Sequence, residues 1–256
     1  MTIQIATRSV GRVPGTDMSP LTLYESPRVA SLRDDLALAL RAAAHHGLGE
    51  GICNHFSVVV PATEAFLINP RGLLWSEIGG ADIVLVDAAG AKLAGRHAVE
   101  PTAMFIHAAV HRIAAKAVVM HTHMPHATAL TLTARRGLDT TLSQTAMRFH
   151  GRVAIDPNYG GLALDDREGE RIAAAVGDAD VVFLANHGVI VCGERIDHAF
   201  DDLYYLERAC QVEVIARTTG LPLAPVDAGV AALVAAQASG ERMQAEMYFE
   251  ALRRTL

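Results

Sequence analysis

The sequence lacks the features that mark membrane proteins, secreted proteins and nucleic-acid-binding proteins. No apolar run approaches the roughly 18 residues that a membrane-spanning helix needs, so we expect no contact with a membrane. The N-terminal segment has neither the apolar stretch nor the cleavage site of a secretory signal. A net charge of −6 provides no basic field, which argues against a nucleic-acid partner.

Cysteine is also scarce. The chain has three cysteines, an odd number, and no CxxC spacing: Cys53, Cys192 and Cys210. This pattern indicates neither a disulfide framework nor a thiolate metal site. A reducing, cytoplasmic setting is therefore expected.

Hydrophobic residues are abundant, at 51% of 256 residues, which is enough for a large packed core. Short β-rich runs (FSVVV, AFLIN, DIVLV, AVVMH, RVAI, VVFLA) alternate with segments of helical periodicity. Helices are expected over Arg28–His46, from Pro101, after His123, and over Asp166–Val176, Arg195–Thr219 and Val226–Arg254. The pattern predicts one α/β domain over residues 26–256, preceded by an N-terminal arm at 1–25 that lacks periodicity.

Two histidines at the end of an apolar strand are the first candidates for metal ligands. In VVMHTHMPH, His121 and His123 are two residues apart, and side chains at i and i+2 of a strand point to the same face. His187 follows another apolar strand, where Gly188 permits a tight turn. Three neutral imidazoles suit Zn²⁺, Mn²⁺, Fe²⁺ or Co²⁺ and leave coordination positions open for a substrate. Spacing alone leaves a second interpretation open, in which HTH is a half-buried pair hydrogen-bonded to the backbone.

Other histidines are candidates for supporting roles. His107 and His111 are four residues apart on one predicted helix and share a face. Because no further ligand lies nearby in the sequence, a packed or supporting role is favoured over a second metal site. His126 and His150 lie close to the proposed site in sequence.

Taken in order, these motifs resemble the class II aldolase/adducin family. The similarity follows the runs FLINPRG, DIVLVDAAG, IHAAVH, AVVMHTHMPHATAL and LANHGVIVCG, and HTH with a later NHG is its most specific mark. The resemblance implies a three-layer α/β/α sandwich around a mainly antiparallel central sheet. It also implies a homotetramer with active sites at subunit interfaces, and one divalent metal ion per subunit held by His121, His123 and His187.

The chain departs from the sugar-phosphate aldolases of this family at the acid. Those enzymes place an acidic residue four positions before the histidine that matches His107, and here that position is Ala103. Glu100, one helical turn earlier, shares that face of the helix and is the candidate replacement.

The phosphate-binding elements differ as well. Where the aldolases have a GNxS-like and a TPSG-like loop, this chain has CNHFS and NPRG. Hydroxyls are lost while an imidazole and a guanidinium are gained, which favours a planar carboxylate over a phosphate. With SQTAMRFHG added, the candidate substrate-binding residues are Asn54, His55, Ser57, Arg71, Gly72, Gln144 and Arg148. For the two arginines the alternative is a structural ion pair.

The expected activity is metal-dependent cleavage of a carbon–carbon bond, with the negative charge left on an enolate or phenolate. The altered loops favour a decarboxylase acting on a hydroxylated aromatic or pyridine dicarboxylate, such as 3-hydroxy-2-methylpyridine-4,5-dicarboxylate or a dihydroxyphthalate. Mn²⁺ or Zn²⁺ is the expected ion. Glu100, His150 and Tyr248 are the candidate acid–base residues.

Two alternatives stay open. One is an aldolase that cleaves a small hydroxy-keto acid or a sugar phosphate. The other is a non-catalytic, adducin-type interaction module, which shares the absence of an acid at Ala103. Retention of all three histidines argues against the module, because a scaffold has no use for converging imidazoles.

Overall fold

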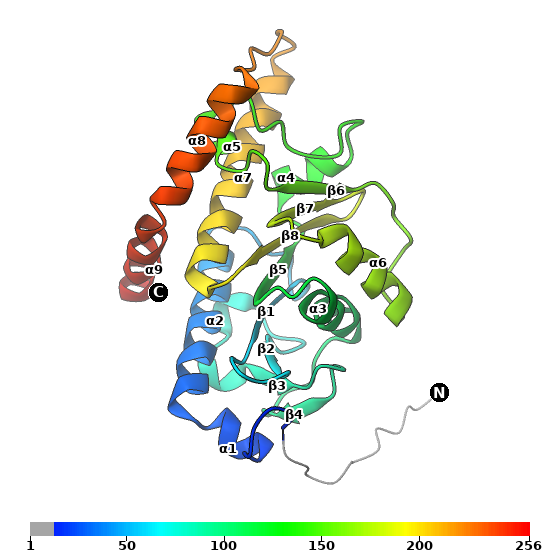
Figure 1. Ribbon diagram of the computed structural model, residues 1–256, viewed down its shortest axis with the longest axis vertical. Helices are drawn as coiled ribbons and strands as arrows, with labels where there is room; N and C mark the ends of the chain where they lie inside the picture. Colours follow the sequence, from blue (N-terminus) through cyan, green and yellow to red (C-terminus); the bar gives the residue numbers. More distant parts are fainter. Residues whose placement is uncertain (1–12) are drawn as a thin grey trace.

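The computed structural model describes residues 13–256 and is built on an eight-stranded sheet (Figure 1). The strands are β1 His55–Val59, β2 Phe66–Ile68, β3 Val84–Val86, β4 Lys92–Ala94, β5 Val118–Thr122, β6 Val153–Asp156, β7 Val181–Leu184 and β8 Gly188–Gly193. The α-helices are α1 Pro20–Tyr24, α2 Pro27–His45, α3 Pro101–Ile113, α4 Pro125–Thr131, α5 Gln144–Met147, α6 Asp166–Val176, α7 Ile196–Thr218, α8 Ala228–Gly240 and α9 Met243–Thr255. Two short 3-10 helices, η1 Trp75–Glu77 and η2 Gly80–Asp82, precede β3.

The sheet has the strand order β4-β3-β2-β1-β5-β8-β7-β6. Neighbouring strands are antiparallel except for β6 and β7, which are parallel, so the sheet is mixed. The expected α/β class and mainly antiparallel sheet are confirmed. The parallel pair is possible because α6 forms the crossover connection that parallel neighbours require.

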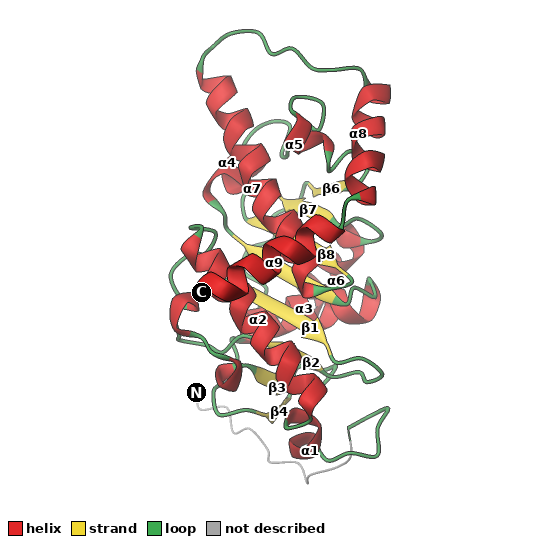
Figure 2. Ribbon diagram, turned by 90° about the vertical axis from the view of Figure 1, so that its left-hand side faces the viewer, coloured by secondary structure: helices red, strands yellow, loops and turns green. Residues whose placement is uncertain are grey.

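Alternate residues of the central strands point to two separate cores. Val118 and Met120 of β5 pack into the larger core with residues of α2, α4 and α7. Val119 faces the other side and packs with residues of α3 and α6. Figures 1 and 2 show the same division, with α2, α7 and α9 on one face of the sheet and α3 and α6 on the other.

Capping residues in the sequence predicted the bounds of α6. α6 begins after Asp165, whose carboxylate accepts from the backbone N–H of Glu168 at 3.0 Å, and ends at Gly177. Its observed bounds are those predicted. The helix expected after His123 is α4, which begins at Pro125 and ends at Thr131.

The C-terminal region differs from the single helix expected over Val226–Arg254. It forms α8 and α9, which are separated by Glu241 and Arg242. The break falls at Glu241, whose φ and ψ of −105° and 25° depart from helical values. Arg242, beside it, binds the buried carboxylate of Asp202 in α7, with N–O distances of 3.0 and 2.7 Å. A long-range ion pair of this kind leaves no local signal.

The predicted N-terminal arm is only partly described, because residues 1–12 lie outside the described residues. The remainder is not an arm. Val13, Leu23 and Tyr24 are buried in the larger core, and the Tyr24 hydroxyl donates to the carbonyl of Ile83 at 2.7 Å. Hydrophobic burial therefore holds this segment against α2 and β4, and the Tyr24 hydrogen bond joins it to Ile83.

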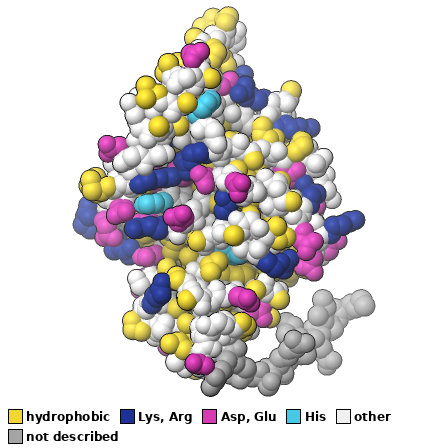
Figure 3. Space-filling model, in the orientation of Figure 1, with side chains coloured by type: hydrophobic (Ala, Val, Ile, Leu, Met, Phe, Trp, Pro, Cys, Tyr) yellow, Lys and Arg dark blue, Asp and Glu magenta, His cyan; other side chains and the backbone are white. Residues whose placement is uncertain are grey.

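On the face shown in Figure 3, basic and acidic side chains are intermingled. No helix within residues 13–256 is long and apolar enough to cross a membrane.

Candidate metal centre

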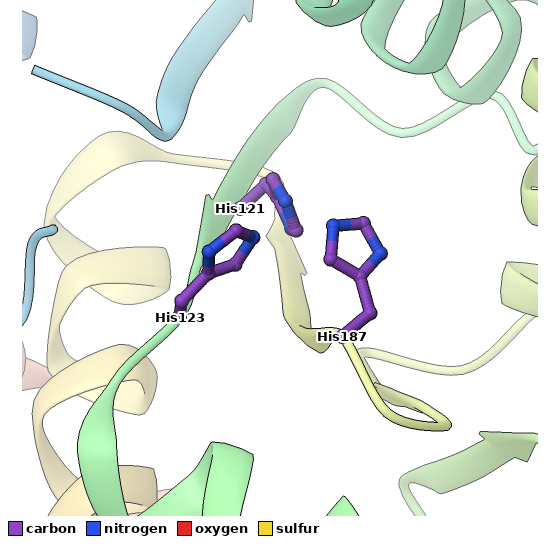
Figure 4. A group of neighbouring side chains, drawn as sticks. All are labelled: His121, His123 and His187. Atoms are coloured by element: carbon purple, nitrogen blue, oxygen red, sulfur yellow. The ribbon is translucent and has the colours of Figure 1, made fainter. Parts of the chain in front are cut away.

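The three predicted ligands meet at one point of the structure. His121 lies on β5, His123 directly follows it, and His187 lies in the turn between β7 and β8. Their ring centroids are separated by 5.0, 4.8 and 4.9 Å, close to an equilateral triangle. One ligand nitrogen from each lies within 4.8 Å of the others. Figure 4 shows the rings turned toward a common centre.

Hydrogen bonds fix which nitrogen of two rings faces that centre. His121 Nδ1 lies 3.0 Å from the carbonyl oxygen of Val189. A carbonyl only accepts, so Nδ1 carries the proton and Nε2 keeps its lone pair. His123 Nδ1 lies 2.6 Å from a carboxylate oxygen of Glu50, with the same consequence. The alternative interpretation, in which both rings bond to the backbone, therefore holds only for the His121 ring. Its bond to the Val189 carbonyl leaves Nε2 of His121 free to bind a metal.

Burial keeps two of the three rings, His121 and His187, uncharged before an ion binds. The pKa of His121 lies well below its ordinary value, mainly because the ring is buried and then because His187 and His123 are close. The pKa of His187 falls to about 4, again chiefly through burial, with His123 second. Both rings are therefore neutral at neutral pH, which is the form that binds a metal.

A glycine allows the turn to approach the strand. A Cβ added to Gly188 would lie 2.5 Å from the carbonyl oxygen of Thr122 and 2.8 Å from His123 Cδ2. Asn186, two residues earlier, has a left-handed backbone with φ of 58°, a conformation that Asn adopts more readily than most residues. The tight approach brings His187 to the end of β5.

The donor set fits a divalent ion. His123 Nε2 is buried, and the described residues provide no hydrogen-bond partner for it. An unpaired buried polar atom costs about 1–3 kcal/mol, and a bound cation would remove that cost. Three imidazoles with open positions match the ligand set of catalytic zinc sites and also suit Mn²⁺, Fe²⁺ or Co²⁺.

A second cluster of potential ligands is already neutralised. Asp197, His198 and Glu246 place ligand atoms within 4.8 Å of one another. However, Arg195 lies 2.5 Å from Asp197 and 3.5 Å from Glu246. The cluster therefore joins α7 to α9 as an ion-pair network.

Three predicted substrate-binding residues come from the loop and strand beside the triad. His55 pairs with His121 in the β1–β5 register, so the two side chains share a face of the sheet. The pKa of His55 falls to about 4 through burial and, second, through His123. Asn54 has φ of 74°, and its Oδ1 accepts from the backbone N–H of His123 at 3.2 Å. His55 and Asn54 therefore lie beside the triad, and their binding of a substrate stays a prediction.

The third, Ser57, has a different partner from the one expected. Its Oγ lies 2.6 Å from His107 Nδ1 and 2.7 Å from His111 Nε2, and the side chain is fully buried. His111 Nδ1 donates to the carbonyl of Lys116 at 2.6 Å. Ser57 therefore donates to His111 and accepts from His107, which assigns these two histidines the supporting role predicted for them. A hydroxyl committed in this way replaces the expected substrate contact.

Two candidates of opposite charge are paired with each other. Arg71 Nε lies 2.7 Å from a carboxylate oxygen of Glu100, with 57% and 27% of the side chains exposed. Gly72, beside Arg71, has φ of 87° and open space around it. The ion pair considered as the alternative role of Arg71 is therefore formed. The Arg71 guanidinium is exposed and still has N–H donors available.

Three further candidates line a different cavity. Gln144, Arg148 and Tyr248 belong to a cavity of ≈ 780 Å³ between α5, α7, α8 and α9, whose lining includes none of the three triad histidines. Arg148 is bonded to Asp201 and lies 4.0 Å from the Tyr205 ring centroid. This is the structural ion pair weighed from the sequence.

Tyr248 and His150 each have a partner outside the triad. The Tyr248 hydroxyl is 2.8 Å from His46 Nε2, and burial raises its pKa. His150 Nδ1 is 2.9 Å from the Thr140 hydroxyl. The structure thus brings neither residue to the triad through a direct contact.

Two residues near the triad were not among the sequence candidates. Glu50 holds the His123 ring, and Tyr159 has its ring centroid 6.2 Å from that of His187. Neither lies in a motif, and their proximity depends on loops that meet only in the folded chain. The sequence offered no signal for Glu50, and nothing in it distinguished Tyr159 from the other four tyrosines.

Comparison with curated proteins places these features in a family context. A protein of Pseudomonas aeruginosa with a provisional class 2 aldolase name is 37% identical over 193 residues, covering 75% of this chain and 73% of that protein. Decarboxylase NovR of Streptomyces niveus is 29% identical over 221 residues, covering 84% and 81%. Rat alpha-adducin is 32% identical over 191 residues, covering 72% of this chain but 25% of that protein.

Solved structures show a similar relationship to class II aldolases. The crystal structure of an aldolase II superfamily protein from Pseudomonas syringae superposes with a TM-score of 0.84 at 34% identity, covering 92% and 95% of the two chains. The L-fuculose 1-phosphate aldolase of Glaciozyma antarctica superposes with a TM-score of 0.78 at 25% identity, covering 91% and 96%. Residues 34–214 match the Class II Aldolase and Adducin N-terminal domain, and the chain belongs to this family.

Proposed function

We propose that this chain is a metal-dependent carbon–carbon lyase and, within that class, a decarboxylase of a hydroxylated aromatic or pyridine dicarboxylate. The observation that carries the proposal is the convergence of His121, His123 and His187 at one point, with Nε2 of two rings oriented as ligand atoms. A divalent ion bound there supplies a Lewis acid for negative charge that develops on a substrate oxygen.

The absence of an acidic residue at Ala103 favours loss of CO₂ over aldol cleavage. Ala103 is 1% exposed and packs against Phe66 and Ile68 in a small apolar cluster. Aldol cleavage needs a base to remove the proton of the hydroxyl group. Decarboxylation needs no such base, because CO₂ leaves from a carboxylate that is already ionised. A chain with alanine at this position is therefore better suited to decarboxylation.

His55 beside the triad, together with Arg71, suits a compact, anionic substrate. His55 is neutral and shares a face with His121, so its ring can donate or accept a hydrogen bond beside the ion. Arg71 carries an exposed guanidinium that can bind a carboxylate while Glu100 orients it. We assign carboxylate binding to Arg71 and hydrogen bonding to His55.

The final step of a decarboxylation is protonation of the carbanion. Glu100 and His150 remain candidates from the sequence, and Tyr159 joins them because its ring lies near His187. Tyr248 is the weakest candidate in a single chain, since its hydroxyl is bonded to His46. A neighbouring subunit could change this assignment, because homotetramer interfaces form part of the proposal.

The surface of the C-terminal helices is consistent with such an assembly. Leu233 on α8 and Met243 and Met247 on α9 are 58%, 66% and 56% exposed. Large exposed apolar side chains mark subunit contacts where they form a continuous patch. The cytoplasmic setting expected from the sparse cysteines belongs to the same proposal.

The test is a screen of aromatic and pyridine dicarboxylates with protein reconstituted with Mn²⁺ or Zn²⁺. We expect CO₂ release from at least one hydroxylated member, and no release by the His123→Ala variant. Failure of every such acid would contradict the decarboxylase assignment.

An aldolase is the second candidate, supported by the likeness to the L-fuculose 1-phosphate aldolase structure. Release of an aldehyde without CO₂ from a hydroxy-keto acid or a sugar phosphate would favour it. The third candidate, an adducin-type module, rests on the likeness to alpha-adducin. Failure of the purified protein to bind any transition metal after reconstitution would favour the module.

A further inference from the structure

The three histidines of the triad are supported unequally by the fold. His121 lies inside β5 and is 4% exposed, and its ring is held by the carbonyl of Val189 in the neighbouring strand. His123 lies one residue beyond the end of β5, and 25% of its side chain is exposed. The sheet therefore fixes His121, whereas His123 needs support from outside the sheet.

One loop provides that support. The segment 49–54, the later part of the connection between α2 and β1, contacts His123 twice. Glu50 Oε2 lies 2.6 Å from Nδ1 of the ring, and Asn54 Oδ1 accepts from the backbone N–H at 3.2 Å. The loop is closed on itself by the Cys53 N–H, which donates to the Glu50 carbonyl at 2.9 Å. The same short loop thus holds both the ring and the backbone of this ligand.

The chemistry of the contact determines what it can do. A carboxylate accepts the Nδ1 proton, so the ring is held in the tautomer whose Nε2 lone pair is free. That Nε2 atom is the buried one with no partner among the described residues. A carboxylate on the outer nitrogen also makes the ring a more basic ligand.

The exposure of the pair argues against a purely structural role. Glu50 has 62% of its side chain exposed, and exposed ion pairs contribute about 0–1 kcal/mol to stability. Outer partners of metal-bound histidines, in contrast, change metal affinity by roughly 10–100-fold. The larger consequence of this contact should therefore appear in metal binding and not in folding.

We propose that Glu50 is a positioning residue of the metal centre, which orients His123 and fixes its tautomer without touching the ion or the substrate. This inference rests on the proposed metal-dependent function.

The test compares Glu50→Ala and Glu50→Gln with Glu64→Ala, an exposed glutamate on the loop at the other end of β1. The dissociation constants for Zn²⁺ and Mn²⁺ are measured by competition with a chromophoric chelator, and the melting temperature is measured without metal. We expect Glu50→Ala to bind about 10–100-fold more weakly. Glu50→Gln should be intermediate, because its amide oxygen still accepts the Nδ1 proton. Glu64→Ala should match the wild type, and all melting temperatures should agree.

A second measurement isolates the orienting role. Two-dimensional ¹⁵N NMR of the metal-free protein reports the tautomer of the His123 ring. We expect the Nδ1–H form in the wild type and a mixture of both forms in Glu50→Ala, a change that a merely structural residue would not cause. Metal affinity of Glu50→Ala within twofold of the wild type, or an unchanged tautomer, overturns the inference.

The two proposals fail in different ways. If His123→Ala weakens metal binding while Glu50→Ala does not, the role of Glu50 is wrong and the metal centre stands. If the wild-type chain binds no divalent ion, the metal centre is wrong and the role of Glu50 falls with it.

Discussion

Gly188 offers a test of how closely the β7–β8 turn must approach β5. In Gly188→Ala the added Cβ would lie 2.5 Å from the carbonyl oxygen of Thr122, whereas ordinary contacts begin at 3.4 Å. The difference, 3.4 − 2.5, requires a displacement of about 0.9 Å. The same Cβ would lie 2.8 Å from His123 Cδ2, so that ring must move as well.

This displacement is large on the scale of a metal site. Ligand distances in such sites are held to roughly ±0.2 Å, so a shift of this size should separate His187 from His123 and weaken metal binding at least tenfold. Overpacking costs about 1–3 kcal/mol. At about 2–4 °C per kcal/mol for a chain of this size, the melting temperature should fall by several degrees.

The assay pairs chelator competition for Zn²⁺ with thermal unfolding of the metal-free protein. Gly240→Ala is the matched control, because an added Cβ there meets nothing within 4 Å. If Gly188→Ala binds the ion as tightly as Gly240→Ala does, the close approach of turn and strand has no bearing on the site and the reasoning is wrong.

Three further predictions concern charge and hydrogen bonding. His55 and His111 have pKa values of about 4 in the folded chain against 6.5 ordinarily, so the unfolded chain binds more protons between these values. The free energy of unfolding should then fall as pH drops from 6.5 to 4, and equal urea midpoints at both ends would contradict this. Glu207 is buried and accepts from two backbone N–H groups at the start of α4, at 2.9 Å each. Glu207→Ala should lower the free energy of unfolding in urea by about 1–3 kcal/mol. An unchanged urea midpoint would argue against this cap. Arg71→Ala should raise KM for a dicarboxylate at least tenfold with a nearly unchanged melting temperature, since its pair with Glu100 is exposed; an unchanged KM would remove Arg71 from the substrate site.

The parts of the site that the sequence could predict are those that depend on local periodicity. Strand alternation places His121 on one face, and the apolar run before His187 identifies a second strand. The bounds of α6 follow from Asp165 and Gly177, which cap the helix through their own chemistry. Such features need no knowledge of the rest of the fold.

The features that could not be predicted depend on contacts between distant segments. Glu50 meets His123 across 73 residues, and Arg242 meets Asp202 across 40. Arg148 looked available for an anion because its partner, Asp201, lies 53 residues later in the chain. Ion pairs between distant segments therefore decide which charged residue remains free to bind a substrate. Residue type and spacing in the sequence do not reveal these pairs.

The most direct test of the metal centre is the number of ions bound per chain. Elemental analysis after reconstitution with Zn²⁺ would compare the wild type with His187→Ala and with His198→Ala, a histidine of the other ligand cluster. We predict one ion per chain in the wild type and in His198→Ala, and none in a folded His187→Ala variant. An ion retained by His187→Ala, or lost from His198→Ala alone, would contradict the proposed centre.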